Sequence, residues 1–257
     1  MLNGSSENQP VRTPSLPDPP DLKDLSQAAL FLDFDGTLVE IAPAPDAIRV
    51  DPGLPAVLRA LAEMLDGRLA VVSGRSIADI STYLDTDGIA LAGSHGGELR
   101  RPGDTAIETI AEPLPPRVLE EFTRFAAGRE GLLIETKPYS VALHYRQLPS
   151  LEAEVLDLAG SLADSMNLRL KRGKMVVEML AHGYDKGTVV EKIMEVPAFQ
   201  GSQPIFVGDD ITDEDAFTKV LKLNGGGVLV GPERDTAARW RLPAVADVHT
   251  WLKASLA

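Results

Sequence analysis

The sequence predicts an α/β fold: a parallel sheet covered by helices, with a second, smaller α+β domain inserted into it. First, short apolar runs alternate with amphipathic segments in the first and last parts of this 257-residue chain, as in sheets buried on both faces. Second, between roughly residues 108 and 180 the strands instead alternate apolar with polar residues and come in hairpin-like pairs. Third, polar residues follow several of the apolar runs directly.

The parallel sheet is predicted from strands and helices that alternate along the chain. Its helices have apolar residues at helical spacing, as in residues 54–65, where leucines recur on one face. Ligands of such sheets bind at the carboxyl ends of the strands. In chain order the segments are strand 28–33, helix 54–65, strand 68–73, helix 77–84, strand 89–92, strand 204–210, helix 212–222 and strand 226–231.

The middle of the chain predicts an antiparallel sheet covered on one side only. Tyr139, Val141 and Leu143 fall on one face of a strand and His144 on the other, and Lys174 and Glu178 share one face of a later strand. Two helices, at about 115–128 and 151–164, are available to cover the apolar face. We therefore predict an inserted domain at 108–181 and a main domain formed by 26–107 and 182–257. The Pro- and Ser-rich residues 1–25 are predicted to be a flexible segment.

Composition excludes several classes of function. The net charge of −13 and the pI near 4.8 argue against a nucleic-acid partner. The absence of cysteine rules out disulfides, thiolate catalysis and cysteine-bound zinc. No apolar run approaches the length of a membrane span, and the first residues lack the apolar core of a secretory signal. We expect a cytoplasmic protein with no membrane partner.

Two aspartates, Asp33 and Asp35, follow the first predicted strand in the stretch LFLDFDGTLVE. Residues two apart on an extended chain point the same way, so both carboxylates can serve one site. A calcium loop is not favoured, because Thr37 and Ala44 occupy positions where such a loop carries acidic ligands; a plain structural turn stays open. The second acidic cluster, GDDITDED at 208–215, again follows a strand, and carboxylates from two strand ends can enclose Mg²⁺.

A phosphate would also need donors and positive charge. Ser73, in SGRS, follows a strand and precedes a helix, where free N–H groups favour anions, although a simple helix cap explains it too. Lys186, in YDKGT, would by itself be a solvated surface charge, but beside the acidic clusters it becomes the group that neutralises phosphoryl oxygens. The residues together indicate phosphoryl transfer, with one carboxylate as nucleophile and a neighbour as acid and base.

The stretches DFDGTL, SGR, DKG and GDDITDED, in this order, resemble the four motifs of the haloacid dehalogenase-like phosphohydrolases. The resemblance covers the chain from Leu30 onwards and implies a Rossmann-like core with a cap domain inserted between the second and third motifs. It implies Mg²⁺ as the cofactor. The implied roles are Asp33 as nucleophile, Asp35 as general acid and base, Ser73 and Lys186 as phosphoryl-binding groups, and Asp33, the carbonyl of Asp35, Asp209 and Asp213 around the metal.

Within that superfamily, GSHGGELR, IETKPYSVALHYR, GKMVVEM and GDDITDEDAF are similar to the trehalose-6-phosphate phosphatase family. The resemblance implies a small sugar phosphate as the substrate and a functional link to trehalose-6-phosphate synthase. The implied substrate-binding residues are Gly74, Arg75, Glu135, Lys137, Arg146, Lys174 and Glu178. Any one of the cap charges has an alternative interpretation as part of a solvated sheet face.

Other functions stay open at this point. A phosphatase for sucrose phosphate or mannosyl-3-phosphoglycerate would share the architecture, and a phosphomutase would return the phosphoryl group to a sugar. A receiver-like signalling domain also combines acidic residues, Ser or Thr and Lys on an α/β fold, but needs neither Asp35 nor the insertion. A sugar-phosphate sensor without activity is disfavoured, because every catalytic position is filled.

Overall fold

The computed structural model describes residues 15–25, 27–42, 47–137 and 139–257. Its larger unit contains an eight-stranded sheet with the order β12-β11-β10-β1-β2-β3-β4-β5. Neighbouring strands are parallel from β12 to β3 and antiparallel from β3 to β5. The strands are β1 Ala28–Leu32, β2 Leu69–Val72, β3 Ala90–Gly93, β4 Glu98–Arg100, β5 Glu108–Thr109, β10 Gln203–Gly208, β11 Gly226–Val230 and β12 Trp240–Leu242.

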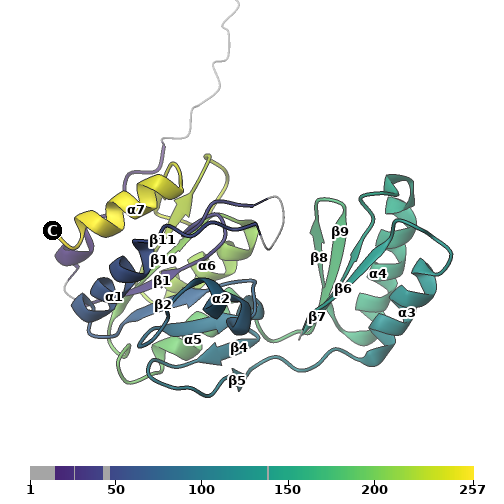
Figure 1. The fold of residues 1–257 in the computed structure, drawn as a ribbon, viewed down its shortest axis with the longest axis horizontal. Coiled ribbons are helices and arrows are strands. Elements are labelled where there is room, and N and C mark those ends of the chain that lie inside the picture. The colour runs from purple at the N-terminus through teal and green to yellow at the C-terminus, as the bar shows by residue number, and fades with distance from the viewer. Residues whose placement is uncertain (1–14, 26, 43–46, 138) are drawn as a thin grey trace, which may run out of the picture.

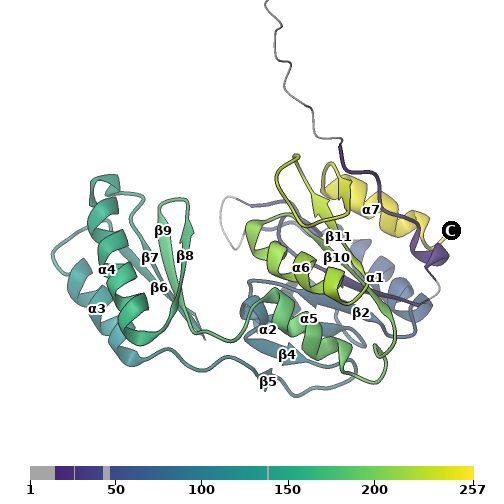
Figure 2. The same cartoon turned by 180° about the vertical axis from the view of Figure 1, so that it is seen from behind.

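Helices cover both faces of this sheet. The side chains of Leu30 and Leu32 in β1 pack with α1, α2 and α7, and those of Ala29 and Phe31 pack with α5 and α6. Figure 1 looks onto the side of α1, and Figure 2 looks onto the side of α5 and α6. This burial on both faces explains why β1 is apolar at every position. The helices are α1 Leu54–Met64, α2 Ile77–Tyr83, α5 Lys186–Met194, α6 Glu214–Lys222 and α7 Val245–Ala254.

The smaller unit is the cap, a four-stranded antiparallel sheet with the order β6-β7-β9-β8 and two helices. Val141, Leu143, Val177 and Met179 point to the helices and form a core with them. Figures 1 and 2 both show α3 and α4 on the side of this sheet that faces away from the larger unit. The other face of the cap sheet is therefore turned towards the larger sheet. The elements are α3 Pro116–Ala126, β6 Leu133–Lys137, β7 Ser140–His144, α4 Glu152–Met166, β8 Arg169–Gly173 and β9 Val176–Leu180.

The predicted fold class is confirmed, and the structure adds elements that the sequence did not indicate. The short strands β4 and β5 extend the large sheet in the antiparallel sense, and β12 and α7 complete its opposite end. Because β5 pairs with β4, residues 108–109 belong to the larger sheet. Among the described residues there are also four 3₁₀-helices: η1 Leu22–Asp24, η2 Ser94–Gly96, η3 Pro149–Leu151 and η4 Ile211–Asp213.

The strand order sets the place of the site. From β1 the chain continues to β2 and β3 on one side, and after the cap it returns to β10 and β11 on the other side. Such a reversal opens a crevice at the carboxyl ends of the two central strands. Asp33 follows β1, and its backbone N–H donates to the carbonyl of Val207 in β10 over 2.9 Å. The first and the last acidic motifs are therefore neighbours.

The expectation of a flexible segment as far as residue 25 is wrong for residues 15–25; residues 1–14 lie outside the described residues. The side chain of Leu22 is 1% exposed and belongs to the core beneath α1 and α7. Trp251 Nε1 donates to the carbonyl of Pro20 over 3.0 Å, and Arg241 N donates to that of Pro17 over 2.9 Å. A proline-rich stretch is thus held in place, because its carbonyls accept hydrogen bonds from the C-terminal region.

In the part of the chain that the structure describes, no helix is both long enough and apolar enough to cross a membrane.

Candidate active site

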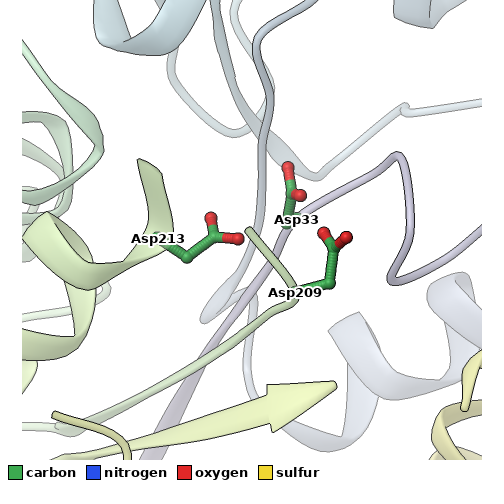
Figure 3. Close-up of side chains that lie close together, drawn as sticks. All are labelled: Asp33, Asp209 and Asp213. Atoms are coloured by element: carbon green, nitrogen blue, oxygen red, sulfur yellow. The ribbon is translucent and has the colours of Figure 1, made fainter. Parts of the chain in front are cut away.

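Three buried or half-buried carboxylates meet at the crevice. Asp33 follows β1, Asp209 follows β10 and Asp213 ends η4, and Figure 3 shows their side chains converging. One oxygen from each carboxylate lies within 4.8 Å of the others. This is the spacing that shared coordination of one cation requires.

Lys186 is the cation that the chain itself supplies to these carboxylates. Its Nζ lies 2.8 Å from Asp33 Oδ1 and 2.6 Å from Asp213 Oδ1. Lys186 begins α5, where Asp185 caps the helix by accepting from the N–H of Thr188 over 2.7 Å. Burial by itself lowers the pKa of the Lys186 ammonium, but Asp213 and Asp33 outweigh it and hold the pKa above its usual value. The lysine is therefore charged.

The carboxylates carry more charge than Lys186 balances. Three carboxylates face one ammonium, which leaves an excess of two negative charges when all are ionised. Burial raises the pKa of Asp33 well above its usual value, against the opposing effect of Lys186, and burial followed by the charge of Asp213 raises the pKa of Asp209 to about 6. A divalent cation would remove this repulsion.

Two further observations fit a cation at this place. Asp209 Oδ1 is buried and has no hydrogen-bond partner, an uncommon state for a buried carboxylate oxygen. Gly36, with a φ of +80°, approaches so closely that a Cβ would lie 2.2 Å from Asp209 Oδ2. The glycine of the first motif is thus required for the two acidic loops to meet. The residues present fit a hard divalent ion such as Mg²⁺.

Asp35 is not part of this cluster. Its two carboxylate oxygens accept from Arg75, Oδ2 from Nε over 2.7 Å and Oδ1 from Nη2 over 3.0 Å. Arg75, which the family resemblance assigned to substrate binding, thus has a carboxylate of the chain itself as partner. The role of the Asp35 backbone carbonyl as a metal ligand stays a prediction.

Ser73 and Gly74 lie on the other side of the crevice, after β2. Ser73 is 1% exposed, and its Oγ accepts from the backbone N–H of Arg75 over 3.1 Å, which leaves its own proton available for donation. Gly74 lies beneath the ring of His95, where a Cβ would come within 2.5 Å of Cε1. Asp33, Asp35, Ser73 and Lys186 line one hollow of about 360 Å³. The structure therefore brings the four predicted catalytic residues together.

A second hollow, of about 450 Å³, lies between the core and the polar face of the cap sheet, and we call it the cleft. Glu135, Lys137 and Glu178 line it from the cap, and Gly74 and Arg75 line it from the core. Their role in substrate binding stays a prediction. Asp35, Gly74 and His95 line both hollows, so the two spaces adjoin at these residues.

Arg146 and Lys174 are not among the residues that line the cleft. Strict alternation along the strands predicted that they share the polar face. Instead β7 ends at His144, so Arg146 is exposed in the turn that follows. Lys174 is exposed in the turn between β8 and β9, and Met175 after it has a positive φ of 62°, which interrupts the alternation. Their role in substrate binding remains a prediction.

Lys171 lies in the cleft and was missed by sequence reasoning. It is directly opposite Glu178 in the register of β8 and β9, and Glu178 and Glu135 both pair with Ala142 of β7, so these positions form one row across the sheet. The alternation of RLKRG around Lys171 was the available signal. Assigning the polar face required the strand register, which the turn at 173–175 sets.

The cleft contains both acidic and basic side chains, which affect one another's pKa values. Burial raises the pKa of Glu178, yet Lys137 at 3.1 Å and the hydroxyl of Ser140 at 2.6 Å outweigh it and lower the pKa overall. Burial lowers the pKa of Lys171. Burial, and after it the charges of Lys171 and Lys186, lower the pKa of His95 to about 3, so its imidazole is neutral. Acceptors and donors thus stand side by side, as sugar hydroxyls require.

Comparison with known proteins assigns the family. The family model described as trehalose-phosphatase matches residues 31–245, which include every residue of both hollows. This chain belongs to the trehalose-phosphatase family. It is 36% identical over 243 residues to a trehalose-6-phosphate phosphatase of Escherichia coli (94% of this chain, 90% of the relative) and 39% identical over 212 residues to a probable trehalose-phosphate phosphatase of Sinorhizobium fredii (81% and 80%).

A solved structure supports the fold of this family member. The C-terminal domain of a Candida albicans trehalose-6-phosphate phosphatase superposes with a TM-score of 0.78 at 22% identity, covering 94% of this chain and 98% of the other. At that identity the likeness speaks for the fold alone. The resemblance seen in the four motifs is thereby confirmed at the level of family and fold.

Proposed function

We propose that this chain is a Mg²⁺-dependent phosphatase that hydrolyses trehalose 6-phosphate to trehalose and phosphate. The observation that carries the proposal is the position of Asp33, buried at the end of β1 between Lys186 and the other two carboxylates and open to the hollow that Asp35 also lines. Membership of the trehalose-phosphatase family supports the substrate.

In the first step a carboxylate oxygen of Asp33 attacks phosphorus, and the bond between phosphorus and the oxygen on carbon 6 of the sugar breaks. Asp35 gives its proton to that oxygen, so trehalose leaves as a neutral alcohol and an aspartyl phosphate remains on Asp33. A sugar alkoxide is a poor leaving group, which is why a proton donor at this place matters.

In the second step a water molecule attacks the phosphorus of the aspartyl phosphate. Asp35, now ionised, takes a proton from that water, and the bond from phosphorus to Asp33 breaks to release phosphate. Lys186 and Ser73 bind phosphoryl oxygens in both steps, Lys186 with its charge and Ser73 with its hydroxyl. Each residue returns to its starting state.

Asp33, Asp209 and Asp213 would hold Mg²⁺, directly or through its waters. When bound, Mg²⁺ supplies positive charge that offsets the repulsion between the phosphate and these carboxylates and stabilises charge on the transferring group.

The cap supplies recognition of the sugar in this proposal. Glu135, Lys137, Lys171 and Glu178 present acceptors and donors across the cleft from Asp35. A disaccharide phosphate with its phosphate at Asp33 would extend its second sugar towards them. A functional link to a trehalose-6-phosphate synthase, as the source of the substrate, belongs to the same proposal.

The decisive experiment measures phosphate release from trehalose 6-phosphate, sucrose 6-phosphate, glucose 6-phosphate and p-nitrophenyl phosphate. We expect kcat/KM to be highest for trehalose 6-phosphate, activity to vanish in EDTA and to return with Mg²⁺, and Asp33→Asn to be inactive yet folded. Preference for another sugar phosphate would contradict the substrate assignment. Full activity in EDTA would contradict the requirement for Mg²⁺. An active Asp33→Asn variant would contradict the proposed mechanism.

A further inference from the structure

Arg75 has the contacts of a residue that acts through Asp35. Nε and Nη2 of Arg75 donate to the two oxygens of Asp35 over 2.7 and 3.0 Å, a bidentate pair that fixes the plane of the carboxylate. Nη1 donates to Asp79 Oδ2 in the first turn of α2 over 2.7 Å. The side chain of Arg75 is only 14% exposed, compared with 35% for Asp35 and 40% for Asp79.

The guanidinium is itself held firmly by the core. Its Cζ lies 5.8 Å from the ring centroids of both Phe34 and Tyr83, within the range of cation–π attraction. The backbone N–H of Arg75 donates to Ser73 Oγ, which ties the residue to the end of β2. A planar guanidinium fixed in this way can orient a flexible carboxylate, and a lysine ammonium in its place cannot form the same fork.

Asp35 stands where a proton donor is needed. It is outside the cluster of three carboxylates but lines both the hollow around Asp33 and the cleft beneath the cap. In the proposed reaction the bond that breaks joins the phosphoryl group in the first space to the sugar in the second. A carboxyl at their junction can reach the leaving oxygen.

We propose that Arg75 is a positioning residue, which holds the carboxyl of Asp35 at this junction. Without the fork, the half-exposed carboxyl of Asp35 would be free to rotate away from the leaving oxygen. The assignment rests on the proposed function and replaces the role in substrate binding that the family resemblance implied for Arg75.

The test compares two substrates whose leaving groups differ in their need for a proton. p-Nitrophenolate leaves without a proton, whereas a sugar alcohol needs one, and both substrates give the same phosphoenzyme on Asp33. The variant is Arg75→Lys, which keeps the charge and loses the fork. The matched control is Arg59→Lys, which alters an arginine whose ion pair with Asp85 is exposed (59% and 55%); neither residue lines either hollow.

For Arg75→Lys we expect kcat/KM for trehalose 6-phosphate to fall about 30-fold or more, within the range of general acid catalysis, while the burst rate with p-nitrophenyl phosphate changes less than about threefold. Because the second step also uses Asp35, the burst should approach one p-nitrophenol per enzyme and be followed by a slower steady state. Adding Arg75→Lys to Asp35→Asn should cost less than about a further threefold, because both changes remove the same function.

Other outcomes overturn the assignment. A rise of KM for trehalose 6-phosphate alone, with kcat and the burst unchanged, would make Arg75 a substrate contact. Equal slowing of the first step with both substrates, or losses that multiply in the double variant, would make it structural. If Arg75→Lys does not fold, Asp79→Asn, which removes the charge from the outer anchor of the guanidinium, must show the same pattern in weaker form. Wild-type protein that cleaves p-nitrophenyl phosphate but not trehalose 6-phosphate would refute the proposed function. The burst of p-nitrophenol from the Arg75→Lys variant would still test the role of Arg75.

Discussion

Lys186 Nζ lies 2.8 Å from Asp33 Oδ1, and the two side chains are 3% and 6% exposed. The same ammonium lies 2.6 Å from Asp213 Oδ1, whose side chain is completely buried. Since none of these groups faces bulk water to any extent, the loss of one partner leaves the others charged in the interior. Lys186 is therefore needed to hold the site together even before a substrate is bound.

Replacing this lysine should destabilise the protein. We expect Lys186→Met to lower the free energy of unfolding by about 3–5 kcal/mol, because it leaves buried carboxylates without their cation. Added Mg²⁺ should restore part of the loss. Urea denaturation with and without Mg²⁺ measures both effects. The control is Lys219→Met, which removes the more exposed pair with Glu191 and should cost less than about 1 kcal/mol. Equal losses in the two variants would refute the argument.

Binding of Mg²⁺ should depend on pH through Asp209. Burial and the charge of Asp213 raise the pKa of Asp209 to about 6, so in the metal-free protein its carboxyl takes up a proton as the pH falls below that value. The proton competes with the cation, and the affinity for Mg²⁺ should rise between pH 5 and pH 7 and then level off. Calorimetric titration at several pH values measures this dependence.

The variant Asp209→Asn removes the titrating group. It should bind Mg²⁺ about 10- to 100-fold more weakly and with a flatter pH dependence. If the wild-type affinity does not change between pH 5 and pH 7, then Asp209 is ionised throughout, and the excess of charge in the cluster has been overestimated.

The cap should act on the sugar and not on the phosphoryl group. Lys171→Ala and Glu178→Ala should each cost about 1–3 kcal/mol in kcat/KM for trehalose 6-phosphate, since each leaves a polar partner unpaired in the cleft. The same variants should change p-nitrophenyl phosphate hydrolysis less than about twofold, because that substrate has no second sugar. Steady-state kinetics with the two substrates gives the ratio.

Lys174→Ala is the matched control for the cap, because Lys174 has the same charge but lies in the exposed turn outside the cleft. It should leave both activities close to those of the wild type. A larger loss for Lys174→Ala than for Lys171→Ala would show that Lys174 contacts the substrate, as the family resemblance implied.

The packed segment before β1 should contribute to stability. Leu22→Ala should lower the free energy of unfolding by about 2–4 kcal/mol, because it leaves a cavity in the core beneath α1 and α7. Leu133→Ala, at a leucine that is 62% exposed, should change it by less than about 0.5 kcal/mol. Thermal unfolding provides the comparison. A Leu22→Ala protein as stable as the wild type would mean that the segment detaches in solution.

Part of the site was predictable because its signals are local in the sequence. Asp33, Ser73, Lys186 and Asp209 each directly follow a strand or begin a helix, and in a parallel sheet all such positions face the same edge. The alternation in 139–145 likewise predicted the one-sided cap sheet. The sequence also indicated the chemistry, since hard oxygen ligands beside a lysine suit a cation and a phosphate.

What the sequence by itself determined was thus the fold class, the four acidic and basic motifs and the family they indicate. Only the tertiary structure decided that Arg75 pairs with Asp35, that Lys171 and not Lys174 lines the cleft, and that residues 15–25 are packed. The physical reason is the same in each case. A side chain's partner is set by long-range contacts, by the register across a turn and by which polar groups remain unsatisfied in the folded interior, and none of these is encoded in local spacing.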